Sequence, residues 1–372
     1  QLEYDTENIS NLHYGLIHVG LPTMVNLVQD RLPNIKDGNK PKNYELCKEG
    51  DVAFADASED TNEVAKAIEF YNLNGRDVIC GLHTIHGRDN KHKTIVGFKG
   101  YAFLSAAFHN QIRRIAQGTK IYSISTKNFS ECYIGLPSKP EQTKIATLLR
   151  LIDERIATQN KIIEDLKKLK SAIVEMILCK QGGVLLKLGD VGSFIRGLTY
   201  SSEDIAEDIN ATTVIRANNL NYGNNVSKKD VVYVNKKPTE IQILRKGDIV
   251  ICMANGSSSL VGKNSYYSFD DRQSTIGAFC GIYRSSQPLV KWLMQSQRYR
   301  RLVYQSLQGG NGAIANLNGD DILNMTFYVV EDKKSVSILS ALVLIENSIA
   351  VNEKLQELYS MQKEYLLQHL FI

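Results

Sequence analysis

Two stretches far apart in the chain repeat one heptad pattern of apolar residues, and each is long enough for a helix of many turns. They run from Lys144 to Leu166 and from Ser337 to Leu358, and a shift of 193 residues superimposes them without a gap. Polar residues match as well, since Lys161 coincides with Lys354. Because an apolar seam of this kind requires a partner helix, the pattern predicts helix–helix packing through these residues: Ile145, Leu149, Ile152, Ile156 and Gln159 in the first stretch, and Ile338, Leu342, Ile345, Ile349 and Asn352 in the second.

The repeat extends upstream of both helices. The segment "EGDVAFADAS" from Glu49 resembles "KGDIVICMANGSS" from Lys246. The chain therefore reads as a duplicated unit, a globular domain followed by a spacer helix. The predicted division is a first globule over 1–137, a first spacer over 138–182, a second globule over 183–330 and a second spacer over 331–372. The second copy opens with "LLKLGDVGSFIRGLTYS", whose counterpart would lie before Gln1, so we expect that the opening of the first copy is missing.

Each globule is predicted to mix helices and strands. Segments such as "DVVYVN" and "DIVICM" are rich in β-branched residues, as strands are. Residues 102–117 and 287–307 each predict one helix. The expected fold class is α+β: two tandem mixed α/β globules separated by two long helices.

Chain order favours an antiparallel arrangement of the two long helices. The first helix leaves one globule for the other, and the second would return along it. About 38 residues at 1.5 Å each give a spacer of ~57 Å, with the copies related by a pseudo-two-fold axis. Gln159 and Asn352 lie near the helix centres and are expected to meet. The alternative is two independent surface helices, each packed on its own domain.

Composition excludes several classes of protein. The chain has 372 residues and a formal net charge of +4, divided as −1, +3, +4 and −2 over the four predicted segments. Nucleic-acid binding therefore requires that cations gather on one face. We find no apolar run of bilayer length and no secretory signal. Six cysteines stand singly, without a CxxC pair, which indicates a reducing, cytoplasmic setting.

No motif indicates catalysis. The chain has no GxGxxG, no Walker-type loop, no GxSxG and no Asn-Pro-Pro-aromatic tetrapeptide. One group of metal-binding residue types, Cys80, His83, His86 and His92, has spacings that fit no standard zinc pattern, and the second copy has no equivalent histidines. We therefore predict no catalytic residue and no metal.

The residues present suit binding. The segments "VIRANNLNYGNN" and "MANGSSSLVGKN" are rich in Asn, Ser, Arg, Lys and Gly. Asn and Arg can bond base edges, while Ser and Lys reach phosphates. The plainer interpretation is that these residues only form turns.

The order of globules and helices resembles the specificity subunit of type I restriction–modification enzymes. The most specific run starts at Leu136 and contains Pro137, Glu141 and Gln142 before the first seam. Further matches are the "GD" motifs at Gly50-Asp51 and Gly247-Asp248 and the "KLGDVGSFIRG" opening at Lys187. The second helix departs from this pattern, with Val330 in place of Pro137 and Lys334-Ser335 in place of Glu141-Gln142.

The resemblance implies a DNA-binding, non-catalytic subunit. Each globule would be a target recognition domain that reads one half of a bipartite site in double-stranded DNA, and the helices would set the spacing and dock the methyltransferase subunits, two in number. Restriction and translocase subunits would join the complex. S-adenosylmethionine, ATP and Mg would belong to these partners, and no cofactor would bind this chain.

Candidate DNA contacts are chosen for polarity and loop position, because recognition domains vary with the sequence they read. They are His18, Ser58, Lys66, Arg88, Asn90, Lys91 and His92 in the first copy, and Arg216, Asn218, Asn219, Asn255, Ser257, Ser258, Lys263, Arg272 and Gln273 in the second. The main alternative from another class is a coiled-coil scaffold that binds protein rather than DNA. A stand-alone nuclease or methyltransferase is disfavoured, because its motifs are missing.

Overall fold

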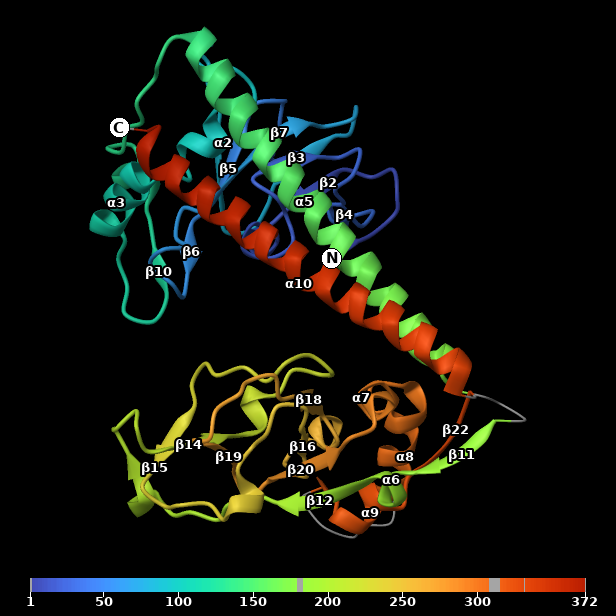
Figure 1. Ribbon diagram of the computed structural model, residues 1–372. Coiled ribbons are helices and arrows are strands. Elements are labelled where there is room, and N and C mark those ends of the chain that lie inside the picture. The colour runs from blue at the N-terminus through green and yellow to red at the C-terminus, as the bar shows by residue number, and fades with distance from the viewer. Residues whose placement is uncertain (1, 179–182, 308–314, 331, 372) are drawn as a thin grey trace. The chain divides into compact units, whose positions relative to one another are not determined.

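The computed structural model describes residues 2–178, 183–307, 315–330 and 332–371 (Figure 1). By packing, the chain divides into two compact units. Unit 1 comprises residues 1–161 with 353–372, and unit 2 comprises residues 162–352. Each unit therefore holds one globule and part of both long helices, and each is described by itself.

Unit 1 contains two four-stranded sheets and one two-stranded sheet, ordered β3-β7-β5-β9, β1-β4-β2-β8 and β10-β6. Its strands are β1 Leu2–Glu3, β2 Ser10–Leu12, β3 Met24–Asn26, β4 Asn34–Ile35, β5 Val52–Ala55, β6 Ala57–Ser58, β7 Ala67–Asn72, β8 Val78–Cys80, β9 Thr84–Gly87 and β10 Tyr122–Ser123. Its helices are α1 Tyr14–His18, α2 Lys99–Ala102, α3 Ala106–Ile115, α4 Thr126–Phe129 and the first part of α5 Lys139–Met176.

Unit 2 repeats this plan with sheets β12-β20-β16-β18, β13-β15-β14-β19 and β17-β21, and adds the pair β11-β22. Its strands are β11 Val184–Lys187, β12 Gly192–Arg196, β13 Ile205–Ala206, β14 Thr212–Ile215, β15 Val232–Val234, β16 Ile249–Cys252, β17 Ala254–Asn255, β18 Asn264–Tyr266, β19 Ser274–Ile276, β20 Cys280–Ser285, β21 Ala315–Asn316 and β22 Thr326–Val329. Its helices are α6 Leu188–Val191, α7 Pro288–Leu293, α8 Gln297–Leu307, α9 Gly319–Leu323 and the first part of α10 Asp332–His369.

The duplication seen in sequence recurs in sheet topology. Sheets β1-β4-β2-β8 and β13-β15-β14-β19 have the same order, and each has one parallel pair, β2 with β8 and β14 with β19. In the other large sheet, β5 lies between antiparallel neighbours β7 and β9, as β16 lies between β18 and β20. The edges differ, because β3 joins β7 whereas β12, from the opening of the second copy, joins β20. The mixed α/β fold class is therefore confirmed.

The "GD" motifs form one ion-pair arrangement in both copies. Arg88 donates from Nε and Nη2 to Asp51, at 3.0 and 2.6 Å, and Arg284 does the same to Asp248, at 2.7 and 2.6 Å. Both aspartates also accept a backbone N–H three residues upstream, and both are buried. Burial is the largest single influence on the pKa of Asp51 and raises it, but Arg88, the Lys48 N–H and His86 together lower this pKa below its usual value. The motif is thus a structural anchor of each globule.

The helix predicted over 287–307 is two helices, α7 and α8, whereas the helix predicted over 102–117 is the single helix α3, which the short α2 precedes. In unit 1, α2 and α3 are separated at Ser105, and in unit 2, α7 and α8 are separated at Ser296. Each serine hydroxyl accepts a backbone N–H from the following helix, Phe108 N at 3.3 Å and Tyr299 N at 3.2 Å, and donates to a carbonyl of the preceding one. The serines therefore cap one helix while ending the other, which the apolar pattern alone does not reveal.

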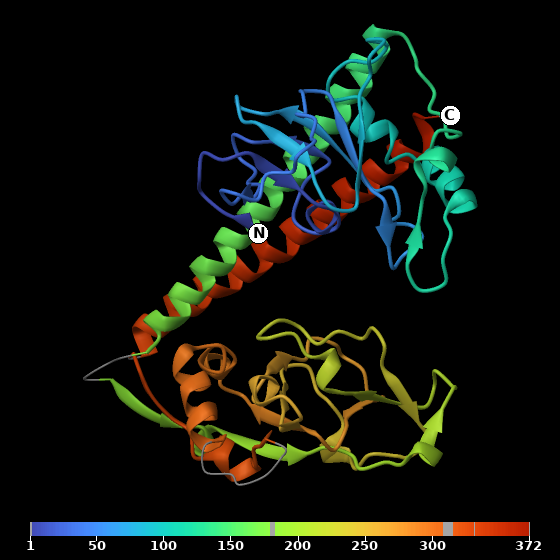
Figure 2. The ribbon, with the colours of Figure 1, turned by 180° about the vertical axis from the view of Figure 1, so that it is seen from behind.

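Helices α5 and α10 each contain 38 residues, the predicted length. All the predicted seam residues are buried or half-buried. In unit 1 the two helices lie side by side (Figures 1 and 2), with Lys363 Nζ 2.6 Å from Asp153 and Arg155 bonded to the Tyr359 hydroxyl at 3.3 Å. Residue numbers rise along one helix as they fall along the other, so these segments are antiparallel. In unit 2, Lys170 pairs with Glu346 at 3.3 Å.

The finer predictions about the spacer concern the mutual placement of the units. The contact between Gln159 and Asn352 would join unit 1 to unit 2, and the pseudo-two-fold axis would relate them. Both stay predictions, as do the domain boundaries at residues 137, 182 and 330.

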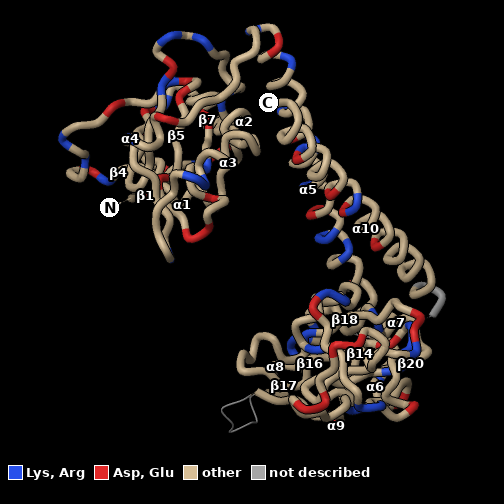
Figure 3. The backbone as a smooth tube through the Cα atoms, turned by 90° about the vertical axis from the view of Figure 1, so that its left-hand side faces the viewer, with Lys and Arg blue, Asp and Glu red and all other residues tan. Residues whose placement is uncertain are grey.

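The prediction that no segment is apolar enough to cross a bilayer is wrong for α10. An 18-residue window within Ser335–His369 has a mean hydropathy of 1.5, and Figure 3 shows this helix mostly in the colour of uncharged residues. The physical reason is that α10 carries apolar residues outside its seam as well as within it. By length and composition it could span a membrane, which for one helix is weak evidence.

Candidate nucleic-acid interface

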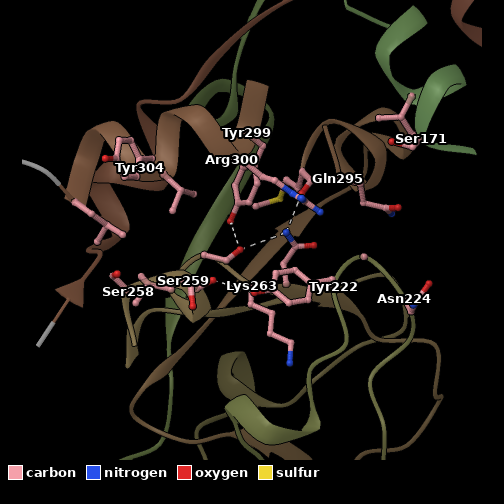
Figure 4. Close-up of a pocket in the computed structure, with 18 of the residues that line it drawn as sticks. Ser171, Tyr222, Asn224, Ser258, Ser259, Lys263, Gln295, Tyr299, Arg300 and Tyr304 are labelled. Atoms are coloured by element: carbon pink, nitrogen blue, oxygen red, sulfur yellow. Dashed lines mark hydrogen bonds between the residues drawn. The ribbon is translucent and has the colours of Figure 1, made fainter. Parts of the chain in front are cut away.

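Unit 2 holds a cavity of about 640 Å³ between α8, the end of α5 and the loops that precede β15 and β18 (Figure 4). Tyr222 lies amid its labelled side chains, with Ser258 and Ser259 on one side and Asn224 on the other. Gln295 lies just before α8, and Arg300 lies within α8. The cavity thus gathers side chains from parts of the chain that are more than 70 residues apart.

The cavity lining is cationic. It includes Lys167, Lys170, Lys263 and Arg300, and no Asp or Glu is among the described residues that line it. Lys170 is committed to Glu346, and burial lowers its pKa. Lys263 Nζ lies 5.2 Å and Arg300 Cζ 5.8 Å from the centre of the Tyr222 ring. Neither makes an ion pair within the ranges that the structure describes, so both charges are free to meet a phosphate.

Tyr222 is held in place but half exposed. Its hydroxyl donates to the Ser259 carbonyl at 2.9 Å, while 49% of its surface stays accessible. Ser257 and Ser259 hydroxyls bond each other at 2.8 Å. An exposed ring flanked by two cations can stack on a base while the cations neutralise the strand.

Buried hydrogen bonds join the segments that line the cavity next to Tyr222. The buried Tyr299 hydroxyl donates to the Gly262 carbonyl at 2.9 Å, and Asn264 Nδ2 donates to the Met294 carbonyl at 2.8 Å. Gly262 has φ +79°, and a Cβ there would lie 2.7 Å from the Val303 side chain. Only glycine allows α8 to approach this closely.

The predicted contact residues of unit 2 fall into three groups: some line the cavity, some are exposed elsewhere, and some are hydrogen-bonded within the globule. Ser258 and Lys263 line the cavity, whereas Asn218, Ser257, Arg272 and Gln273 are exposed elsewhere. Asn219 is buried and bonds the Arg216 N–H and the Lys229 carbonyl, and Asn255 accepts the Ser257 N–H. Arg216 donates to the Asp230 carbonyl, and its Nε is buried without a partner. For Asn219 and Asn255 the structure thus gives the turn-forming role that we set against DNA contact.

In unit 1 the predicted contacts divide similarly. His18 and Lys66 both lie beside Glu63, at 3.5 and 2.7 Å. Arg88 is committed to Asp51, and the Ser58 hydroxyl accepts a backbone N–H.

Asn90, Lys91 and His92 form an exposed loop. Asp89 organises this loop by accepting hydrogen bonds from the Lys91 N–H and from both the N–H and the hydroxyl of Thr94. Burial raises the pKa of Asp89, but these hydrogen bonds and the nearby Lys99 charge together lower it to about 2. DNA contact by any of the predicted residues stays a prediction.

Several residues of the cavity were missed from sequence, among them Tyr222, Gln295 and Arg300. Tyr222 stands within the "NYGNN" run that suggested binding, so an aromatic ring among turn residues was the available signal. Arg300 belongs to "QRYRR" on a predicted helix, where a charge run is usually a solvated face.

The structure also brings together residues that could hold a metal, in unit 1. Cys47, Cys80 and His86 each offer a ligand atom within 4.8 Å of the others. The sequence grouped Cys80 and His86 with His83 and His92 instead. His83 bonds Asp56 at 3.2 Å, and His92 is exposed.

Comparison with known proteins supports the resemblance seen in sequence. Residues 32–168 match the family described as the type I restriction modification DNA specificity domain. The specificity subunits of type I restriction enzymes EcoKI of Escherichia coli (strain K12) and StySPI of Salmonella potsdam are each 28% identical over 164 residues. This match covers 42% of the chain and spans only 35% of the length of each of these relatives.

Two solved structures share the fold. The S subunit of a type I restriction-modification system from M. genitalium aligns with 99% of this chain and 90% of its own, with a TM-score of 0.59 and 15% identity. A chain from structural work on complex assembly and conformational transition of the type I R-M system aligns with 96% of this chain and 90% of its own, with a TM-score of 0.57 and 15% identity.

Proposed function

We propose that this chain, which carries a type I restriction modification DNA specificity domain in residues 32–168 and has the fold of a type I S subunit, is the DNA-specificity subunit of a type I restriction–modification complex. Each globule reads one half of a bipartite site. The observation that carries the proposal is the duplication itself: two globules that share most of their sheet topology, each followed by a 38-residue helix, in a chain whose relatives by sequence are specificity subunits.

The cavity of unit 2 suits contact with a DNA backbone. Lys263 and Arg300 are positioned by the Tyr222 ring and have no described carboxylate partner. Phosphate contacts of this kind supply affinity and fix register, while base edges supply specificity. The exposed candidates Asn218, Ser257 and Gln273 would act in that second role, as would Asn90 in unit 1.

The long helices act as the spacer. At 1.5 Å per residue, 38 residues span ~57 Å, or about 17 base pairs at ~3.4 Å each, which is an upper bound on the separation of the half-sites.

The outer face of α10 suits docking of the methyltransferase subunits. In unit 1, Leu358, Met361 and Tyr365 are 49–60% exposed, and in unit 2, Leu344 and Val351 are 69% and 66% exposed. Apolar residues that recur at helical spacing and face solvent mark a protein interface. Two such subunits, one for each copy, would supply methyl transfer, and restriction subunits would add translocation and cleavage.

The chain itself is non-catalytic in this proposal. S-adenosylmethionine, ATP and Mg serve the partner subunits, and the complex acts in the cytoplasm.

Genome-wide mapping of methylated adenines, with and without this chain, tests the specificity role. We expect one two-part motif to lose methylation when the chain is deleted. If no such motif disappears, the specificity role is excluded. A coiled-coil scaffold would leave the methylation pattern unchanged.

Salt-dependent DNA binding by the assembled complex tests the cavity. Lys263→Ala and Arg300→Ala should each reduce the slope of log affinity against log salt by about 1. Lys237→Ala is the matched control, because Lys237 is an exposed cation of the same unit that does not line the cavity. Slopes equal to that of the control would remove the cavity from the interface.

A further inference from the structure

The two copies share most of their sheet topology, so positions in the shared strands of one copy have structural counterparts in the other. The Cys47 N–H donates to the Val78 carbonyl at 2.8 Å, and the Leu244 N–H donates to the Ser274 carbonyl at 2.8 Å. Both residues stand four positions before the buried aspartate of a "GD" motif. Cys47 therefore corresponds to Leu244.

The same reasoning assigns two further counterparts. Val78–Cys80 and Ser274–Ile276 are the equivalent strands β8 and β19, so Cys80 corresponds to Ile276. His86 pairs with Ala53 across β5 and β9, and Ile282 pairs with Val250 across β16 and β20. His86 thus corresponds to Ile282.

In unit 2 these three positions form part of one apolar core. Leu244, Ile276 and Ile282 are all at most 1% exposed and belong to one cluster. In unit 1 the same three places hold two thiols and an imidazole. At these three positions unit 1 carries residue types that bind zinc, where unit 2 carries hydrocarbon side chains.

The geometry of the sulfurs fits a shared metal. Cys47 Sγ and Cys80 Sγ are 3.7 Å apart. Two thiolates at the usual ~2.3 Å from a tetrahedral zinc ion would be ~3.8 Å apart. One ring nitrogen of His86 lies within 4.8 Å of both sulfurs.

The surroundings of His86 suit a ligand. Its Nε2 lies 2.9 Å from Asp51 Oδ2, inside the buried ion pair with Arg88. A metal-bound histidine usually gives its other N–H to a carboxylate, which fixes the ring and its tautomer. In the tautomer whose Nε2–H donates to Asp51, Nδ1 keeps its lone pair for a metal, and Nδ1 lies 3.8 Å from Glu45 Oε2.

We propose that Cys47, Cys80 and His86 bind one zinc ion in unit 1, with Asp51 orienting the imidazole and the exposed Glu45 carboxylate available as the fourth ligand. The ion ties the segment before β5 to strands β8 and β9, where unit 2 uses hydrocarbon packing. With Glu45 as the fourth protein ligand the coordination sphere is closed, as it is in structural zinc sites.

The full chain, purified under reducing conditions and dialysed, tests this proposal by elemental analysis. We expect one zinc per chain. After chelation, added cobalt(II) should restore the site and give a thiolate-to-cobalt charge-transfer band in the near ultraviolet. Zinc below one tenth per chain together with no such band would overturn the proposal, as would a Cys47–Cys80 disulfide that persists in reductant.

Matched variants localise the site. The triple variant Cys47→Leu, Cys80→Ile, His86→Ile copies the side chains of unit 2 and should bind no zinc. The single variant Cys80→Ser should also lose the band, which covers the case in which the triple variant does not fold. His92→Asn, outside the cluster, should keep both zinc and band. Zinc retained by the Cys80→Ser variant, or lost from His92→Asn, would refute the assignment.

Discussion

Replacing Arg284 by Met should destabilise unit 2 by about 4 kcal/mol. Arg284 donates from two nitrogens to Asp248, which is 2% exposed, and from Nη1 and Nη2 to two backbone carbonyls, at 3.2 and 2.8 Å. Removing one partner of a buried ion pair strands the other charge, at a cost of about 3–5 kcal/mol. The double variant Asp248→Asn, Arg284→Met should be less destabilised than Arg284→Met alone, because no buried charge is left.

Trp292 makes this measurement specific. It is the only tryptophan in the sequence, it is 2% exposed, and it lies in the core of unit 2. Its fluorescence during urea unfolding therefore follows unit 2 alone. With a slope of roughly 2 kcal/mol per molar urea, the midpoint should fall by about 2 M. Arg272→Met, at an exposed arginine, should change it by no more than about 0.3 M. A loss below 1 kcal/mol for Arg284→Met, or an equal loss in the double variant, would refute the reasoning.

Three further predictions follow from burial and backbone geometry. Leu149→Ala, at a fully buried seam position, should cost about 2–5 kcal/mol in urea unfolding followed by circular dichroism, whereas Leu148→Ala, on the exposed side of the same helix, should cost under about 1 kcal/mol. Burial is the main cause that lowers the pKa of His109, so the folded state binds its proton less tightly than the unfolded state. The stability of unit 1 should therefore fall as pH drops through about 6.5, and His109→Phe should flatten that dependence in urea midpoints between pH 5.5 and 7.5; an unchanged profile would contradict it. Gly262→Ala should lower the thermal midpoint of unit 2 and Gly256→Ala should not, because only the first glycine has positive φ and a close neighbour.

The long helices were predictable because their signal is local. A heptad seam repeats every seven residues, so its length and its buried positions can be read without knowing the partner. The seam from Ile145 onward is buried or half-buried throughout, and both helices have the expected length. The break at Ser296 was missed because the apolar pattern does not show that the serine hydroxyl donates to the Leu293 carbonyl and accepts from the Tyr299 N–H.

The candidate site was predicted only in part, because a cavity joins segments by long-range packing. Ser258 and Lys263 were found from the composition of one loop, but Arg300 reaches the same cavity from a helix 37 positions further along. Arg88 was predicted as a DNA contact, but in the structure it pairs with Asp51. An arginine in a polar loop suggests a phosphate contact, yet its fork is occupied by a buried aspartate that only the fold brings near.

The internal repeat is the most informative control that this chain offers. Where the copies agree, as in the pairs Asp51–Arg88 and Asp248–Arg284, the shared geometry indicates a requirement of the fold, because the two globules need not share a target. Where they differ at a shared buried position, packing alone does not explain the choice, because the other copy packs that position with hydrocarbon. By this criterion Arg88 is a structural residue, whereas Cys47 belongs to the zinc site that we propose for unit 1.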